Sequence, residues 1–203
     1  MKKTTPILLA CTFAMAGAAG SARAQNPPKL EITAFTVNMS NIGAGGATTV
    51  QITSDQWSTA DERKAILTTM VEMKNQDALL KALQKSSVKG RFRIPGLMGP
   101  DPHQLRLGHD IRYAWQSPLP DGGMRIVLGT DRYIGFQEAR SMARSMDYPF
   151  TLIEIHVNKA GEGEGKMAVA TMIDFDKEKQ QLVLENYSSE PLRLTKVKVE
   201  VKK

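Results

Sequence analysis

Asp101, His103, His109 and Asp110 are the residues best suited to metal binding or acid–base chemistry, and they lie close together in the sequence. Imidazole nitrogens and carboxylate oxygens are zinc ligands, and a His–Asp pair can also transfer protons during hydrolysis. The prolines and glycines of this stretch predict an irregular exposed loop, in which Asp and His are ordinary residues. We therefore predict no metal and no cofactor, and keep a hydrolytic His/Asp loop as an alternative.

Glu154 and His156 are a second candidate pair for acid–base catalysis. They are two residues apart in an expected strand, so both side chains point to the same face. A polar strand face exposed to solvent is the other interpretation of the pair. The chain contains no Gly-x-Ser-x-Gly, Gly-x-x-x-x-Gly-Lys or His-Glu-x-x-His pattern, so these motifs point to no specific reaction.

Positive charge is concentrated between residues 85 and 145, where ten Lys and Arg residues accompany five acids. Arginine predominates there, and its planar fork binds a carboxylate or phosphate through two donors. A face built from Arg91, Arg93, Arg112 and Arg125 could therefore receive an anionic ligand, provided that their strands adjoin and the arginines point the same way. The alternative is a solvated sheet face with the acids interspersed. Nucleic acid is a poor candidate partner and is not expected, because the charge excess is modest and no aromatic residues alternate with the cations.

The elements that carry these side chains include two amphipathic helices in tandem over residues 59–86, which are expected to pack against a sheet. Thr59 and Glu62 have capping-box spacing at the start of the first helix, and a break is expected around Asn75. Alternation of apolar and polar residues predicts nine strands, at 30–37, 50–53, 88–94, 110–116, 124–128, 150–158, 166–175, 181–186 and 196–201.

Three of these regions carry more specific expectations. Apolar residues of both parities in 30–37 predict a strand that is buried on both faces. Glu162 to Gly165 is expected to be a turn, and the charges of 196–201 predict an edge strand. The fold class is therefore α+β, with an antiparallel-rich, curled or barrel-like sheet of roughly nine strands and the helical pair, in one domain over residues 25–203.

Residues 1–24 have the pattern of a secretory signal peptide. A positive start at Lys2 and Lys3 precedes an apolar run too short to span a bilayer, and Ala22-Arg23-Ala24 supplies small residues for cleavage before Gln25. We expect a periplasmic or secreted bacterial protein with no transmembrane segment after cleavage. A lipoprotein acylated at Cys11 is the alternative.

Removal of the signal peptide also changes the composition. The formal charge falls from +6 to +3, because residues 1–24 hold three basic residues and no acid. Cys11 is the only cysteine of the chain, so the mature protein would contain neither a disulfide nor a catalytic thiol.

These features favour a non-enzymatic exported protein that binds an anionic envelope component or a protein partner. If so, arginines or aromatic residues such as Tyr113 and Trp115 should line its main concavity. The alternatives are an envelope hydrolase that uses the His/Asp loop or the Glu154–His156 pair, and a structural accessory subunit with a large exposed apolar patch.

Overall fold

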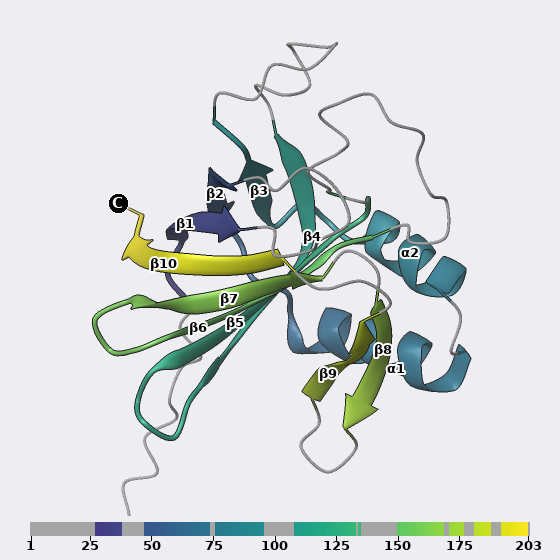
Figure 1. Cartoon of the computed structure of the whole chain (residues 1–203). Coiled ribbons are helices and arrows are strands. Elements are labelled where there is room, and N and C mark those ends of the chain that lie inside the picture. Colours follow the sequence, from purple (N-terminus) through teal and green to yellow (C-terminus); the bar gives the residue numbers. More distant parts are fainter. Residues whose placement is uncertain are drawn as a thin grey trace, which may run out of the picture.

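The computed structural model describes residues 27–37, 47–73, 76–95, 108–132, 134, 150–168, 171–176, 181–187 and 192–202. This part of the chain contains strands and two helices (Figure 1). The strands are β1 (Leu30–Val37), β2 (Ala47–Ser54), β3 (Gly90–Arg93), β4 (His109–Pro118), β5 (Met124–Thr130), β6 (Leu152–Val157), β7 (Glu162–Ala168), β8 (Thr171–Asp176), β9 (Gln181–Tyr187) and β10 (Leu192–Val201). The helices α1 (Ala60–Met73) and α2 (Gln76–Lys85) connect β2 to β3.

Eight strands form a closed barrel, in the order β1-β10-β7-β6-β5-β4-β3-β2, and every neighbouring pair is antiparallel. β8 and β9 form a separate two-stranded sheet, which lies beside α1 (Figure 1). The predicted antiparallel α+β fold is confirmed. The prediction of roughly nine strands in one sheet is wrong, because 166–175 divides between β7 and β8 and the barrel closes without β8 and β9.

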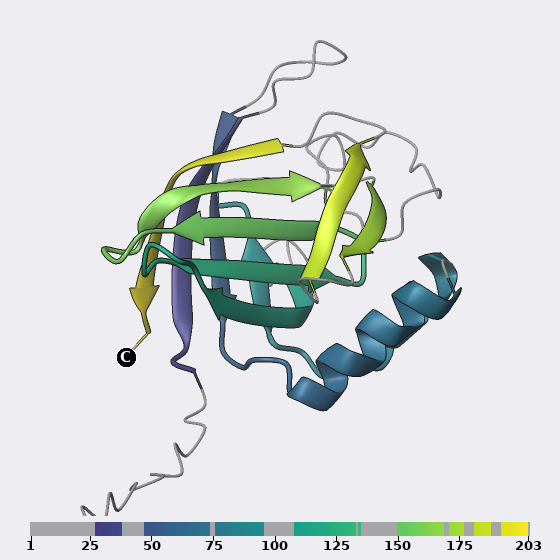
Figure 2. The ribbon, with the colours of Figure 1, turned by 90° about the horizontal axis from the view of Figure 1, so that it is seen from below.

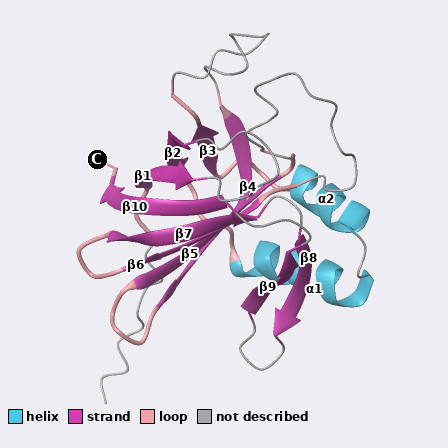
Figure 3. Ribbon diagram, viewed as in Figure 1, coloured by secondary structure: helices cyan, strands magenta, loops and turns pink. Residues whose placement is uncertain are grey.

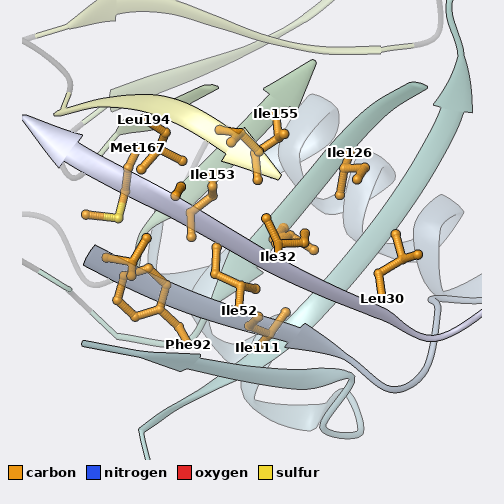
Figure 4. Close-up of a cluster of buried hydrophobic side chains, with 14 of the residues drawn as sticks. Leu30, Ile32, Ile52, Phe92, Ile111, Ile126, Ile153, Ile155, Met167 and Leu194 are labelled. Carbon is orange, nitrogen blue, oxygen red and sulfur yellow. The ribbon is translucent and has the colours of Figure 1, made fainter. Parts of the chain in front are cut away.

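The interior of the barrel is filled by aliphatic side chains, Met167 and Phe92. All eight barrel strands contribute to this cluster, and Phe92, Ile32, Ile52, Ile126 and Ile153 are among its fully buried members (Figure 4). An eight-stranded barrel is just wide enough for side chains to fill. The polar chemistry of the described residues therefore lies outside the barrel or at its ends.

Two β-bulges change which residues face the interior. In β4 the register shifts between Ile111 and Tyr113, and in β10 it shifts between Leu194 and Val197. Each bulge adds one residue, so Ile111 and Ala114 both point inward although they are three positions apart, as do Leu194 and Val197. The backbone of Lys196, inside the second bulge, has a φ of 49°.

The helical pair covers the outer face of β4, β5 and β6. Ile66 of α1 and Leu79 and Leu83 of α2 form a second apolar cluster with Tyr113, Val127, Phe150 and Leu152. The helices lie on one side of the barrel and β1 on the other (Figures 2 and 3). Within the described part, neither helix is long and apolar enough to cross a membrane.

The predicted capping box at the start of α1 is confirmed. The Thr59 amide donates to Glu62 Oε2 at 2.8 Å, and the Glu62 amide donates to Thr59 Oγ1 at 3.1 Å. Two of the four free amides at the helix start are thereby satisfied. The predicted break near Asn75 is also confirmed, because α1 ends at Met73 and α2 begins at Gln76.

Three expectations about strands are wrong. β1 is buried on one face only, since its odd positions, from Glu31 to Phe35, are exposed. β10 is no edge, because it pairs with β1 and β7; its charges simply face solvent on the outside of a closed barrel. Glu162 to Gly165 belongs to β7, and the preceding turn is made by residues 158–161.

Candidate functional site

The His/Asp loop is only partly within the described residues. Asp101 and His103 lie outside them. His109 stacks on Phe92 of the barrel interior, with ring centroids 6.5 Å apart, whereas Asp110 lies on the outer face and forms ion pairs with Arg91 and Arg112. The side chains of His109 and Asp110 therefore lie on opposite faces of β4 and do not form one site. Among the described residues, no three His, Cys, Asp or Glu side chains gather to hold a metal ion.

Arg112 attaches the end of α2 to the barrel. Its Nε lies 3.0 Å from Asp131 Oδ2, one Nη lies 3.3 Å from Asp110, and the other donates to the Ser86 carbonyl oxygen at 3.2 Å. Three partners on three segments occupy most of its five donors. Arg112 is therefore committed to internal contacts rather than to a ligand.

Glu154 does contact His156, and it also holds Arg125. His156 Nε2 is 2.8 Å from Glu154 Oε1, and Arg125 Nε donates to the same oxygen at 2.6 Å. Burial raises the pKa of the Glu154 carboxyl, but the bonds from Arg125 and His156 outweigh this and leave the pKa below its ordinary value. Glu154 is thus an anion at neutral pH, able to orient His156 but not to donate a proton.

Arg63 extends this group to α1. Its guanidinium lies 4.9 Å from the centroid of the Trp115 ring and bonds to Tyr113. Burial raises the pKa of Tyr113 to about 12, against the lowering effect of Arg63 and Arg125. Tyr113 is only 3% exposed and packs under the helices with Ile66 and Leu83. We call Arg63, Tyr113, Trp115, Arg125, Glu154 and His156 the Glu154 cluster.

Within the Glu154 cluster, Arg63 connects α1 to β4, and the contact of Arg125 with Glu154 connects β5 to β6. The Arg125 side chain is 12% exposed and is neutralised by Glu154. His156, whose side chain is 54% exposed, is the most accessible ionisable group of the cluster. The cluster can orient an imidazole for proton transfer, but it offers a ligand little free positive charge.

The four predicted arginines divide into two groups, with Arg91, Arg93 and Arg112 on the adjoining strands β3 and β4, and Arg125 on β5. Arg112 of β4 shares Asp110 with Arg91 and donates to the Ser86 carbonyl, whereas Arg125 belongs to the Glu154 cluster. Arg91 and Arg93 lie on the outer face of β3, where Arg91 is 3.6 Å from Asp110. Arg93 is exposed and makes no ion pair within the described part of the chain. Of the four predicted arginines, Arg93 is thus the one that the described contacts leave most available to a ligand.

Arg93 belongs to a row of exposed side chains that crosses four strands. In register, Arg93 of β3 lies opposite Gln51 of β2, Gln51 lies opposite Thr33 of β1, and Thr33 lies opposite Lys198 of β10. Phe35 and Thr49 form the neighbouring pair on β1 and β2, and Phe35 is 39% exposed. We call these six residues the β1–β2 face.

Sequence reasoning found only Arg93 on the β1–β2 face. Gln51, Thr33, Phe35 and Lys198 stand at alternating positions of recognised strands, but register across strands cannot be read from alternation. Ser86 and Lys89 have the Ser-x-x-Lys spacing of some acyl-transfer enzymes, and that signal was missed. The structure separates the pair, since Ser86 Oγ donates to the Ala82 carbonyl and Lys89 Nζ is held by Glu62 and Ser87.

Comparison of the chain with protein-family models, with curated proteins and with solved structures gave no match. Function therefore has to be inferred from the chemistry of the barrel surface. Two surfaces carry that chemistry: the Glu154 cluster beside α1, and the β1–β2 face on the side of the barrel away from the helices (Figure 2).

Proposed function

We propose that this protein is an exported, non-enzymatic binding protein that holds an anionic envelope component on its β1–β2 face. The observation that carries the proposal is the row from Arg93 through Gln51 and Thr33 to Lys198, with a cation at each end. The signal-peptide pattern of residues 1–24 supports export to the periplasm or beyond.

The filled barrel interior supports binding on the outside. Side chains such as Phe92, Ile32 and Ile153 occupy the space that a hollow barrel would offer to a small ligand. This favours binding on the convex outer surface, where exposed polar and charged residues of the described strands lie.

The cations of the β1–β2 face are available to a partner. Arg93 is exposed, and Lys198 pairs with Glu200 at 2.7 Å in a contact in which both side chains are largely exposed. Glu162 of β7 lies opposite Lys198 in register and also attracts its ammonium. Exposed ion pairs of this kind contribute about 0 to 1 kcal/mol, so an anionic ligand can displace Glu200 at little cost.

An envelope hydrolase is the second candidate function, because Glu154 and His156 are in hydrogen-bond contact at 2.8 Å. A structural accessory subunit has less support. That function needs a large exposed apolar patch. The exposed large apolar side chains of the described residues come from three separate segments and form no such patch: Phe35, Val88 and Val201.

The test uses the mature chain, residues 25–203, and three anionic probes: polygalacturonate, polyglutamate and vesicles that contain phosphatidylglycerol. We expect at least one probe to bind, and we expect Arg93→Gln and Lys198→Gln each to weaken that binding several-fold. Lys81→Gln, which removes an exposed cation from α2, is the matched control and should bind as the wild type does. Absence of binding to all three probes, or equal losses in the control, would refute the proposal.

A further inference from the structure

We infer that the anionic component is an acidic polysaccharide, bound as an extended chain across β3, β2, β1 and β10. This inference rests on the proposed function of the β1–β2 face and names the chemical class of its ligand. It follows from three properties of the face: its curvature, its neutral hydrogen-bonding centre and its single exposed aromatic ring.

The curvature favours a polymer over a small molecule. Small ligands are usually held in concave pockets that bury most of their surface, whereas the outside of a barrel is convex. A polymer can instead make several weak contacts in succession, each raising the effective concentration for the next. Neighbouring strands lie about 4.8 Å apart, so the backbones of Arg93 and Lys198 are separated by about 14 Å across three steps.

The centre of the row is neutral and both donates and accepts hydrogen bonds. Gln51 has an amide, and Thr33 and Thr49 have hydroxyls, all of them exposed. Sugar hydroxyls also donate and accept, so they match these groups directly. Carboxylates spaced along the same chain would meet Arg93 and Lys198 at the two ends of the row.

Phe35 supplies the remaining contact. Its 39% exposed ring stands beside the row, opposite Thr49 on β2 and Thr195 on β10. The apolar C–H face of a pyranose ring can pack on an aromatic ring, which gives a reason for an exposed phenylalanine in a polar surface. A single ring of this kind is too little for the successive base stacking that single-stranded nucleic acid requires.

Other macromolecules fit the face less well. A protein partner would place an apolar core over Gln51 and Thr33 and leave their polar groups without hydrogen bonds. An anionic membrane is bound best by clustered cations next to several apolar residues, whereas the cations of this row stand at its two ends with neutral residues between them. These partners are therefore outcomes of the test and not part of the inference.

The experiment measures binding of the mature chain to polygalacturonate by calorimetry, with neutral dextran, polyglutamate and phosphatidylglycerol vesicles in parallel. We expect polygalacturonate to bind at least tenfold more tightly than dextran and polyglutamate. Arg93→Gln should weaken binding about fivefold and reduce its salt dependence. Phe35→Ala should weaken polygalacturonate binding about fivefold but leave polyglutamate unaffected, and Lys81→Gln should change neither.

The outcomes separate this inference from the proposed function. Preferential binding of polyglutamate or vesicles that depends on Arg93 would overturn the polysaccharide inference and leave the proposed function standing. Binding of none of the probes would overturn both. Because Phe35 and Arg93 are exposed, we expect each variant to keep the urea midpoint of the wild type, so a loss of binding would not reflect unfolding.

Discussion

Lys89 is the charged residue that the fold buries most completely among the described ion pairs, with 4% of its side chain exposed. Both carboxylate oxygens of Glu62 lie 2.8 Å from its Nζ, and Ser87 Oγ lies 2.9 Å away. Glu62 also caps the first turn of α1 through Thr59. One carboxylate thus neutralises a buried ammonium and anchors a helix start.

Replacement of Glu62 tests this double role. Glu62→Gln would leave the Lys89 ammonium buried without a counter-charge, and breaking such a pair costs about 3 kcal/mol of unfolding free energy, less where one partner is partly exposed. We expect a loss of about 2 kcal/mol in urea unfolding. Asp61→Asn, an exposed acid in the same helical turn, is the control and should cost under about 1 kcal/mol. Equal losses in the two variants would contradict the role of Lys89.

The same pair predicts how stability depends on pH. Burial raises the pKa of Glu62, but its bonds with Lys89 and Thr59 outweigh burial and leave the pKa below 4.5. Because the folded-state pKa is lowered, the stabilisation is fully present above the unfolded-state pKa and is lost as pH falls through the folded-state value. The difference in unfolding free energy between wild type and Glu62→Gln should stay constant from pH 7 to 5 and shrink below pH 4.5. A difference that grows in acid would refute the assignment.

Sequence reasoning at this scale succeeded where partners are near in the chain. The capping box of Thr59 and Glu62 and the contact of Glu154 with His156 both depend on local spacing. Arg112 instead bonds to Asp131 and to the Ser86 carbonyl, and these contacts depend on how β4 and β5 align and where α2 ends. Local patterns do not encode that alignment, so the availability of each arginine could not be predicted.

At the scale of elements, the curvature of β7 depends on glycine. Gly163 faces the barrel interior opposite Val157 and Val197, and a Cβ at this position would collide with the carbonyl oxygen of His156. A side chain at residue 163 would force β6 and β7 apart. The close contact between their backbones, which helps to close the barrel, would then be lost.

Gly163→Ala should therefore destabilise the protein by about 1 to 3 kcal/mol, the usual cost of overpacking. Glu164→Ala, at the adjacent exposed position, is the control and should change stability by less than about 0.5 kcal/mol. Urea unfolding of the two variants measures the difference. An unchanged midpoint for Gly163→Ala would show that β7 tolerates a side chain at this position.

The same glycines explain an error in the sequence prediction. Glycine is most common in turns, so the sequence predicts a turn at Gly163 and Gly165, whereas both residues belong to β7. The bulges at Ile111–Tyr113 and Leu194–Val197 were also missed, since an inserted residue breaks the alternation on which strand prediction depends. The existence of most elements followed from periodicity, and their irregularities did not.

At the scale of the molecule, closure joins strands from opposite ends of the chain. β10 fills the position between β1 and β7, and contributes Leu192, Leu194 and Val197 to the interior. Removal of residues 192–203 would expose the interior and leave β1 and β7 each without a neighbour. We expect the shortened chain to show no cooperative urea transition, whereas removal of Lys203 alone should leave the transition intact. A cooperative transition without β10 would show that the remaining strands fold on their own.

Closure also marks the limit of prediction for the whole fold. Alternation predicts an antiparallel, curled sheet, but it does not predict that β1 pairs with β10. In that pair, Thr195 Oγ1 donates to the Phe35 carbonyl oxygen at 3.2 Å, although the two residues are 160 positions apart. No local pattern reports such a contact. The β1–β2 face depends on this pairing, so its row of side chains could only be recognised once the barrel was closed.

The pairing of β1 with β10 has a consequence for the response to mechanical force. Leu30 lies opposite Val201, and the Lys202 amide donates to the Lys29 carbonyl at 2.8 Å, so both strands leave the barrel at the same end. Force applied between residues 27 and 202 would load these antiparallel hydrogen bonds one pair at a time and peel the strands apart. The barrel would therefore open under low tension, by successive rupture of the β1–β10 hydrogen bonds, however stable it is against heat or urea.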